Sequence, residues 1–371
     1  RMTVFASGTA AGTTHNADSS AFTTVSVASN GAVKASDILS SGGTSTKDID
    51  LSANKIIVPK DGSVTFQLWA KISNIQSSSS VSGATTGVHR SGMSPTLGLR
   101  NNIQTSEWDS NYASMANIRT TGKSSGERIY AAATNLTHGN AFVTRKTKPV
   151  VTKQSLSSTT LANTDQDLIK FQVAADAQGS IALKQVMFTI SKTSALTLSS
   201  FRVRKGSTEM STSDFAVNYS STTGDETDVE SGSMATTQNS GYIFVSFTNE
   251  ESISGSGNVY TLHATVSGAV SGQNVSVSFT RDSTSSIVTG YLMSNVGYGN
   301  NLATSTEIFH IDTAVAPDAT TYGNVNATGT FMWSDNSEVP HSSAVGGSAG
   351  SRDWTNDVYI EDVSQSQTLS L

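Results

Sequence analysis

Cysteine is absent from this chain of 371 residues, and only 14% of the residues are charged. Without cysteine there can be no disulfide bonds and no thiolate metal sites, so core burial, bound ions or assembly must stabilise the fold. The net charge of −6 lacks the basic excess with which proteins neutralise nucleic-acid phosphates. No apolar run approaches the ~20 residues that span a bilayer. These absences argue against a nucleic-acid-binding protein and against a membrane-spanning segment.

Helical spacing of apolar residues is also missing, whereas short alternating runs recur along the chain. Alternation of apolar and polar residues is typical of half-buried antiparallel strands. Many strands without crossover helices predict an all-β fold of tandem immunoglobulin-like antiparallel β-sandwich domains, with a short C-terminal β/loop module. His263 lies on the polar side of one run and is predicted to face solvent. The clearest runs are residues 22–27, 64–72, 169–173, 186–190, 201–204, 242–247, 260–266 and 275–279.

One segment occurs twice, because residues 62–73 resemble residues 256–267. We interpret the two copies as one sandwich domain present twice; the alternative is that any two amphipathic strands look alike. The matching apolar positions are Phe66 and Tyr260, Leu68 and Leu262, Ala70 and Ala264, and Ile72 and Val266.

Two proline-containing segments mark the expected domain boundaries. Pro149 cannot donate to a strand ladder and follows a basic cluster, which suits a linker, and Pro317 lies at the second boundary. The chain begins at Arg1 without a signal peptide, so we expect a mature or trimmed product of an exported precursor. The predicted domains are an N-terminal β-sandwich (1–147), a second immunoglobulin-like sandwich (148–316) and a tryptophan-containing tail module (317–371).

The first domain has fewer residues before its copy of the repeated strand than the second domain has. We therefore expect either a smaller complete sandwich or an incomplete one, whose groove a strand from a neighbouring subunit fills. One candidate donor is the segment 2–5, with Met2 and Phe5. The other is the segment 366–371, with Leu369 and Leu371. The predicted partner in this contact is another copy of the chain.

No catalytic residue is predicted. Residues 346–350 fit the formal pattern of a nucleophile elbow around Ser348, with His341 and Asp353 on either side. That motif needs a preceding strand and a following helix to strain the serine, and we expect a Gly/Ser-rich loop here instead. With no paired carboxylates or triad context, the protein is predicted not to be an enzyme.

Aromatic and acidic residues gather in the tail. Trp333 and Trp354 are predicted to be aromatic anchors, either of a small core or of a docking surface. Asp335 and Asp353 are expected to hydrogen-bond turn backbones or, together with Asp357, to bind calcium, which takes about six to eight oxygen ligands. Calcium is the one cofactor that the sequence suggests.

Segments of the second domain and of the tail carry a recognisable pattern of residues. They are Lys148–Thr152, Phe171–Ile181, Phe201–Gly206, Gly329–Asn336, His341, Asp353–Asn356 and Ser366–Leu369. Together these segments resemble the ending "WSD…HS…DWTN…TLS" of S-layer-like cell-surface structural proteins from candidate-phyla-radiation (Patescibacteria-type) bacteria. The resemblance covers roughly residues 148–371 and is specific at the tail, although Asp357 stands where that family usually carries glycine. It implies an extracellular, cell-surface location and a structural role, and it assigns no functional residues.

These observations predict a self-assembling extracellular subunit of a bacterial surface layer or cell-surface filament. Its partners would be copies of itself and the cell envelope. Contacts that repeat without closing generate a filament, and a lattice needs a second set of contacts. The alternative is a surface adhesin or carbohydrate-binding module, in which exposed Trp108, near Asp109 and Asn111, or Trp333 would stack on sugars.

Overall fold

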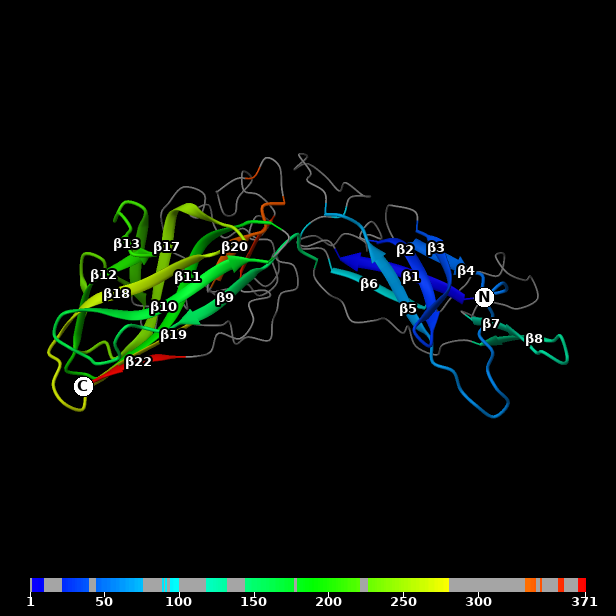
Figure 1. The fold of residues 1–371 in the computed structure, drawn as a ribbon, viewed down its shortest axis with the longest axis horizontal. Helices are drawn as coiled ribbons and strands as arrows, with labels where there is room; N and C mark the ends of the chain where they lie inside the picture. The colour runs from blue at the N-terminus through cyan, green and yellow to red at the C-terminus, as the bar shows by residue number, and fades with distance from the viewer. Residues whose placement is uncertain are drawn as a thin grey trace, which may run out of the picture. The chain divides into compact units, whose positions relative to one another are not determined.

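In the part of the chain that the structure, a computed structural model, describes, every regular element is a β-strand (Figure 1). The strands β1 to β22 form ladders that are all antiparallel, so the prediction of an all-β fold is confirmed. None of the described residues belongs to a helix long and apolar enough to cross a membrane. The described residues are 2–9, 22–39, 45–75, 89, 91, 94–99, 118–131, 144–176, 179–220, 226–279, 331–337, 341, 353–356 and 366–371.

The chain divides into two compact units, Arg1–Arg145 (unit 1) and Lys146–Leu371 (unit 2). In unit 1, a five-stranded sheet has the order β4-β1-β7-β8, with β6 also paired to β1, and a three-stranded sheet has the order β3-β2-β5. The strands of the first sheet are β1 (Met2–Thr9), β4 (Ser45–Ile49), β6 (Ser94–Leu99), β7 (Ile118–Thr121) and β8 (Arg128–Ala131). Those of the second are β2 (Phe22–Ser29), β3 (Ala32–Ile38) and β5 (Gln67–Ile72).

Apolar side chains from both sheets of unit 1 share one core, as in a β-sandwich. Local sequence sets the β2–β3 hairpin, because Asn30 and Gly31 both adopt positive φ angles of 53° and 73°. This pair suits a two-residue turn whose twist matches the flanking strands. The core consists of Met2, Val4, Phe22, Val25, Val27, Leu39, Ile49 and Leu51.

Unit 2 is a larger sandwich. Its six-stranded sheet has the order β13-β12-β18-β10-β9, with β16 also paired to β12. The strands are β9 (Pro149–Gln154), β10 (Asp165–Ala175), β12 (Thr197–Lys205), β13 (Thr208–Glu209), β16 (Ser233–Met234) and β18 (Asn258–Ser267). Its eight-stranded sheet has the order β15-β14-β17-β11-β19-β22, with β20 paired to β11 and β21 paired to β20. The strands are β11 (Ile181–Lys192), β14 (Phe215–Ser220), β15 (Glu226–Asp228), β17 (Ser240–Ile253), β19 (Asn274–Phe279), β20 (Phe331–Ser334), β21 (Trp354–Asn356) and β22 (Gln367–Ser370).

Aromatic rings join the two sheets of unit 2. Phe171 on β10 meets Phe279 on β19 edge to face, with ring centroids 4.8 Å apart and planes at 89°. Phe188 on β11 lies 5.5 Å from Phe171 and 4.9 Å from Phe279. Such edge-on and tilted contacts are favourable between aromatic rings, and they place the core between the two sheets.

The described part of the tail belongs to the eight-stranded sheet. β20 pairs with β11 over Ala182–Val186, next to the stretch Phe188–Lys192 where β19 pairs with the same strand. β19 and β20 therefore lie end to end along β11. β22 pairs with β19 further out. Three segments of the predicted tail module, residues 317–371, thus supply strands to unit 2.

The two copies of the repeated segment form strands in different positions. β18 lies between β12 and β10, whereas β5 lies at the edge of its three-stranded sheet. Val266 is 1% exposed, while its counterpart Ile72 is 40% exposed. At the other three matched positions, the residues of both copies pack against the cores of their units. The environment of the last matched residue differs because an edge strand has only one neighbour.

The prediction that His263 faces solvent is wrong, since its side chain is only 4% exposed. It does point away from the core, on the outer face of β18. An ion pair of 2.6 Å between Arg204 on β12 and Asp167 on β10 crosses β18 on this face, and Glu209 lies 3.5 Å from Nε2 of His263. Burial and the nearby Arg204 charge lower the pKa of His263.

Candidate functional site

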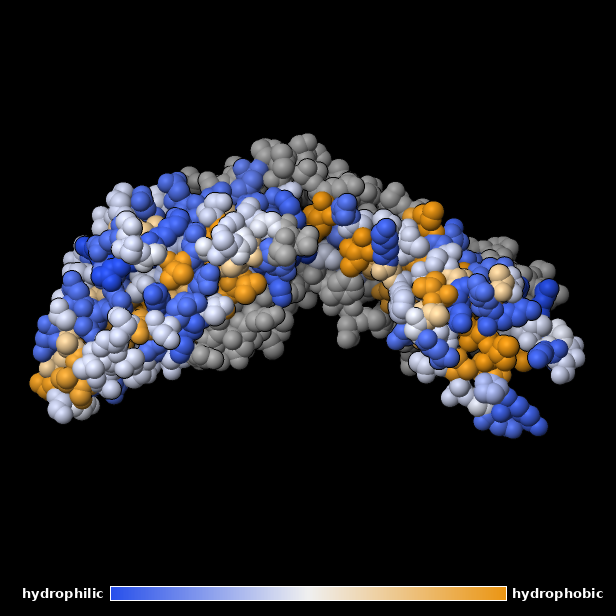
Figure 2. All heavy atoms as spheres, in the orientation of Figure 1, coloured by the Kyte–Doolittle hydropathy of each residue, from blue (hydrophilic) through white to orange (hydrophobic). Residues whose placement is uncertain are grey.

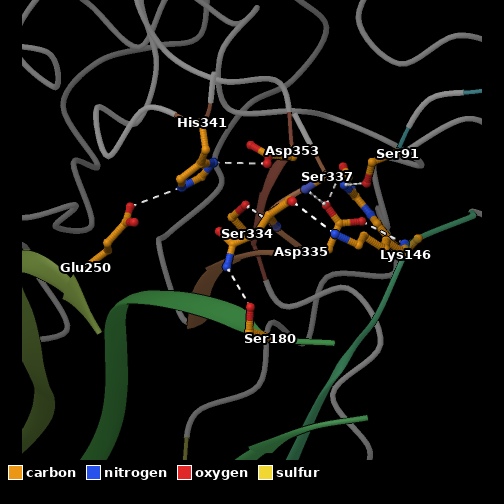
Figure 3. A network of polar contacts seen from close by, with 11 residues as sticks. Ser91, Lys146, Ser180, Glu250, Ser334, Asp335, Ser337, His341 and Asp353 are labelled. Carbon is orange, nitrogen blue, oxygen red and sulfur yellow. Dashed lines mark hydrogen bonds and ion pairs between the residues drawn. The ribbon is translucent and has the colours of Figure 1, made fainter. Parts of the chain in front are cut away.

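The structure brings three residues of the tail pattern, Asp335, His341 and Asp353, into one polar cluster of unit 2 (Figure 3). β20 ends at Ser334, and a turn follows in which Asn336 adopts a positive φ of 49°. Asparagine tolerates this conformation better than most residues. The turn places the Asp335 carboxylate in the interior, where it is fully buried.

Asp335 accepts hydrogen bonds at both carboxylate oxygens. Oδ2 accepts the backbone N–H of Lys146 at 2.8 Å. Oδ1 accepts the hydroxyl of Ser337 at 2.6 Å and its backbone N–H at 3.3 Å. Lys146 Nζ also donates to the carbonyl of Asn336 at 3.3 Å. The carboxylate thereby ties the first residue of unit 2 to a turn almost 200 positions later in the sequence.

His341 lies between two carboxylates. Nδ1 is 3.0 Å from Oδ2 of Asp353, and Nε2 is 3.1 Å from Oε2 of Glu250 on β17. Burial alone would lower the pKa of His341, but the hydrogen bonds and charges of Asp353 and Glu250 outweigh it and raise the pKa to about 10. The imidazole is therefore a cation at neutral pH, and it joins the tail to the body of unit 2.

This geometry bears on the formal triad of Ser348, His341 and Asp353. Histidine and aspartate do meet, but the second ring nitrogen of His341 faces Glu250. A general base must accept the serine proton at that nitrogen, and a protonated histidine held by two carboxylates cannot do so. Ser348 itself lies outside the described residues.

Two of the three calcium candidates, Asp335 and Asp353, have different polar partners in the structure. The Asp335 oxygens accept three hydrogen bonds from Lys146 and Ser337, and Asp353 contacts His341. Asp357 lies outside the described residues. Over the described ranges, no group of three or more His, Cys, Asp or Glu side chains is arranged so that it could hold a metal ion. Calcium binding by this tail stays a prediction.

The predicted aromatic anchors belong to β20 and β21. Trp333 is fully buried and packs in the core of unit 2. Trp354 pairs through its backbone with Ser334. Because Trp333 is buried, it cannot present a flat face to a sugar. Trp108, the other tryptophan of the adhesin reading, lies outside the described residues.

The two predicted donor segments occupy different kinds of position. β1, with Met2 and Phe5, is an interior strand: Val4 pairs with Lys47 on one side and with Leu99 on the other. β22 lies at the end of its sheet and pairs with β19. There Leu369 is fully buried, whereas Leu371 is 47% exposed. Only β22 could leave its sheet without dividing it.

Sequence reasoning did not identify Glu250, Lys146 or Ser337 as partners of this cluster. Glu250 lies 91 positions from His341 and Lys146 lies 189 positions from Asp335, so only the folded chain brings them together. Ser337, two residues after Asp335, carries the one local signal, because aspartate often accepts a backbone N–H two residues later.

Comparisons with known proteins add little to this description. No protein-family model matches the chain, and no curated protein matches it. One solved structure, the full-length RrgB pilus protein from Streptococcus pneumoniae, matches over 76% of this chain with 13% sequence identity and a TM-score of 0.16. The match spans only 41% of the pilus protein. At this TM-score it argues for neither a shared fold nor a shared role.

Proposed function

We propose that the protein is a non-enzymatic, self-assembling structural subunit of a bacterial surface layer or cell-surface filament. The observation that carries this proposal is the placement of the tail pattern resembling envelope structural proteins. Trp333, Asp335 and Asp353 of that pattern are buried. Trp333 packs in the core of unit 2, and Asp335 accepts a hydrogen bond from the backbone of Lys146. Residues with such contacts stabilise the fold of a structural subunit and do not form a substrate site.

The surface chemistry supports the same proposal. Hydroxyl-rich strands with few charges suit close packing against copies of the same surface, because little charge must be desolvated. Exposed large apolar residues lie on strands at sheet edges, such as Ile38 on β3, Ile72 on β5 and Ile129 on β8. Edge strands offer backbone groups that a neighbouring chain can pair with. Figure 2 shows small hydrophobic areas scattered over a largely hydrophilic face of the molecule.

Sedimentation velocity of the purified chain over a hundredfold range of concentration tests the proposal. A structural subunit is expected to move from a monomer to large species as concentration rises. Parallel runs with calcium and with a chelator show whether the ion participates in the contacts. A single monomeric species under all conditions would contradict self-assembly.

A second candidate function is a carbohydrate-binding adhesin, and Trp69 on β5 is the observation that favours it. Its side chain is 42% exposed, and its backbone pairs with Ser26, whose hydroxyl meets that of Ser36 at 2.8 Å. An exposed indole beside hydroxyl groups could stack on a sugar ring. A glycan array probed with the wild type and with Trp69→Ala tests this function, which predicts binding that the substitution abolishes.

A further inference from the structure

The outermost strand of the eight-stranded sheet, β22, has backbone hydrogen-bonding partners on both sides. On one side it pairs with β19 in the register Asn274–Ser370 to Val277–Gln367. On the other side, the backbone of Ser370 bonds to Thr159 and Leu161, at 3.0 Å and 2.9 Å. β22 is thus bonded to β19 along its length and to the Thr159–Leu161 segment at Ser370 alone, and we call the place between these two segments the β22 groove.

Only one side chain of β22 anchors the strand in the core. Leu369 is fully buried, whereas Thr368 and Ser370 on either side of it are exposed. If β22 left its place, Leu369 would therefore be the one core side chain of the strand to become exposed. By contrast, removing β1 from unit 1 would expose both Met2 and Val4 and would split a sheet.

From these contacts we propose that β22 is exchanged between copies of this chain, each copy placing its strand in the groove of the next. An exchanged strand makes the same hydrogen bonds and the same Leu369 contact as a strand from its own chain, so no contact is lost. The equilibrium between a β22 bound in its own chain and a β22 bound in a neighbour then depends on the effective concentrations of the two strands. Crowding on a surface favours exchange.

Exchange of this kind has a defined geometry. The strand of one copy enters the groove of a second, whose own strand is released to a third, so the contact is heterologous and need not close. The product is an open chain of copies. The inference rests on the proposed self-assembly and specifies its contact.

A disulfide test can distinguish exchange from pairing within one chain, because the natural chain has no cysteine. Ser276 on β19 and Thr368 on β22 face each other in register, with their hydroxyl oxygens 3.1 Å apart. Directly opposed residues of an antiparallel pair lie close enough for a disulfide. The single variants Ser276→Cys and Thr368→Cys, one carrying a mass tag, are mixed at assembling concentrations and oxidised.

Exchange predicts a disulfide-linked heterodimer of the two variants, at least about tenfold above the background of a matched control. The control is the pair Ser191→Cys and Ser240→Cys, two exposed residues that face each other on the neighbouring strands β11 and β17 of a single chain. The variant Leu369→Asp should lose the assembled species while near-ultraviolet circular dichroism stays native-like. If that variant unfolds, the heterodimer yield alone decides the question.

The outcomes separate this inference from the proposed function. A double variant that carries both Ser276→Cys and Thr368→Cys in one chain completes the test. Large assemblies without the heterodimer, and with only an intrachain disulfide in this double variant, would overturn the exchange and leave self-assembly intact. A chain that stays monomeric at every concentration would overturn both.

Discussion

The buried carboxylates of unit 2 stabilise the fold through hydrogen bonds to the backbone and to one histidine. Asp335 shows this most clearly, since a charged group without exposed surface is tolerated only where its oxygens have partners. His341 shows the complementary case, a cation placed between two anions. Both residues hold a distant part of the sequence, which gives each a measurable effect on stability.

Replacing Asp335 by alanine should lower the free energy of unfolding by roughly 2–4 kcal/mol, because it leaves the buried donors of Lys146 and Ser337 without an acceptor. Urea denaturation measures the change. Asp214→Ala is the matched control, since that carboxylate is exposed and accepts one bond of 3.3 Å from Ser213. Equal effects of the two substitutions would refute the assigned role of Asp335.

The stability that His341 provides should fall at alkaline pH. Its pKa is raised from about 6.5 in the unfolded chain to about 10 in the folded one. A histidine with a raised pKa contributes its full stabilisation when the pH is below its pKa in the unfolded chain. This stabilisation is lost as the pH rises through its pKa in the folded chain. The difference in unfolding free energy between wild type and His341→Gln should therefore shrink between pH 6.5 and pH 10. A difference that stays constant over this range would rule out the charged histidine.

At the scale of elements, the alternation of apolar and polar residues located strands, because strand formation depends on local sequence. The prediction of an all-β sandwich fold is confirmed. The runs 169–173, 242–247 and 275–279 all fall within strands of unit 2, because side chains of period two suit a half-buried strand. Pairing between distant strands could not be predicted in this way. His263 is buried because Arg204 and Asp167, from two other strands, cover its side chain. The alternation within β18 does not reveal this contact. The predicted domain boundaries and site residues stay predictions.

The end-to-end arrangement of β19 and β20 leads to a prediction about the residues between them. Phe279 pairs with Phe188 and Phe331 pairs with Val186, only two positions apart on β11 and thus about 7 Å. A short linker can span this distance. Replacing residues 281–329 by about four Gly and Ser residues should leave unit 2 folded, with a Tm within a few degrees of wild type by calorimetry. Loss of the cooperative unfolding transition would show that unit 2 needs the replaced residues.

At the scale of the whole molecule, the proposed self-assembly would use strand edges and small apolar patches rather than charge. With 14% charged residues and a net charge of −6, long-range electrostatics contribute little. Raising NaCl from 50 to 500 mM should therefore change the assembled fraction less than about twofold, since salt screens only charge–charge contacts. A pelleting assay measures this, and dissociation at high salt would point to ion pairs at the contacts.

Negative-stain electron microscopy of the purified wild-type chain tests the central claim most directly. Self-assembly predicts filaments or sheets with a regular repeat that appear as the protein concentration rises, and fields of separate particles below that concentration. Separate particles at every concentration, with calcium and with a chelator alike, would contradict the structural role and favour a binding module.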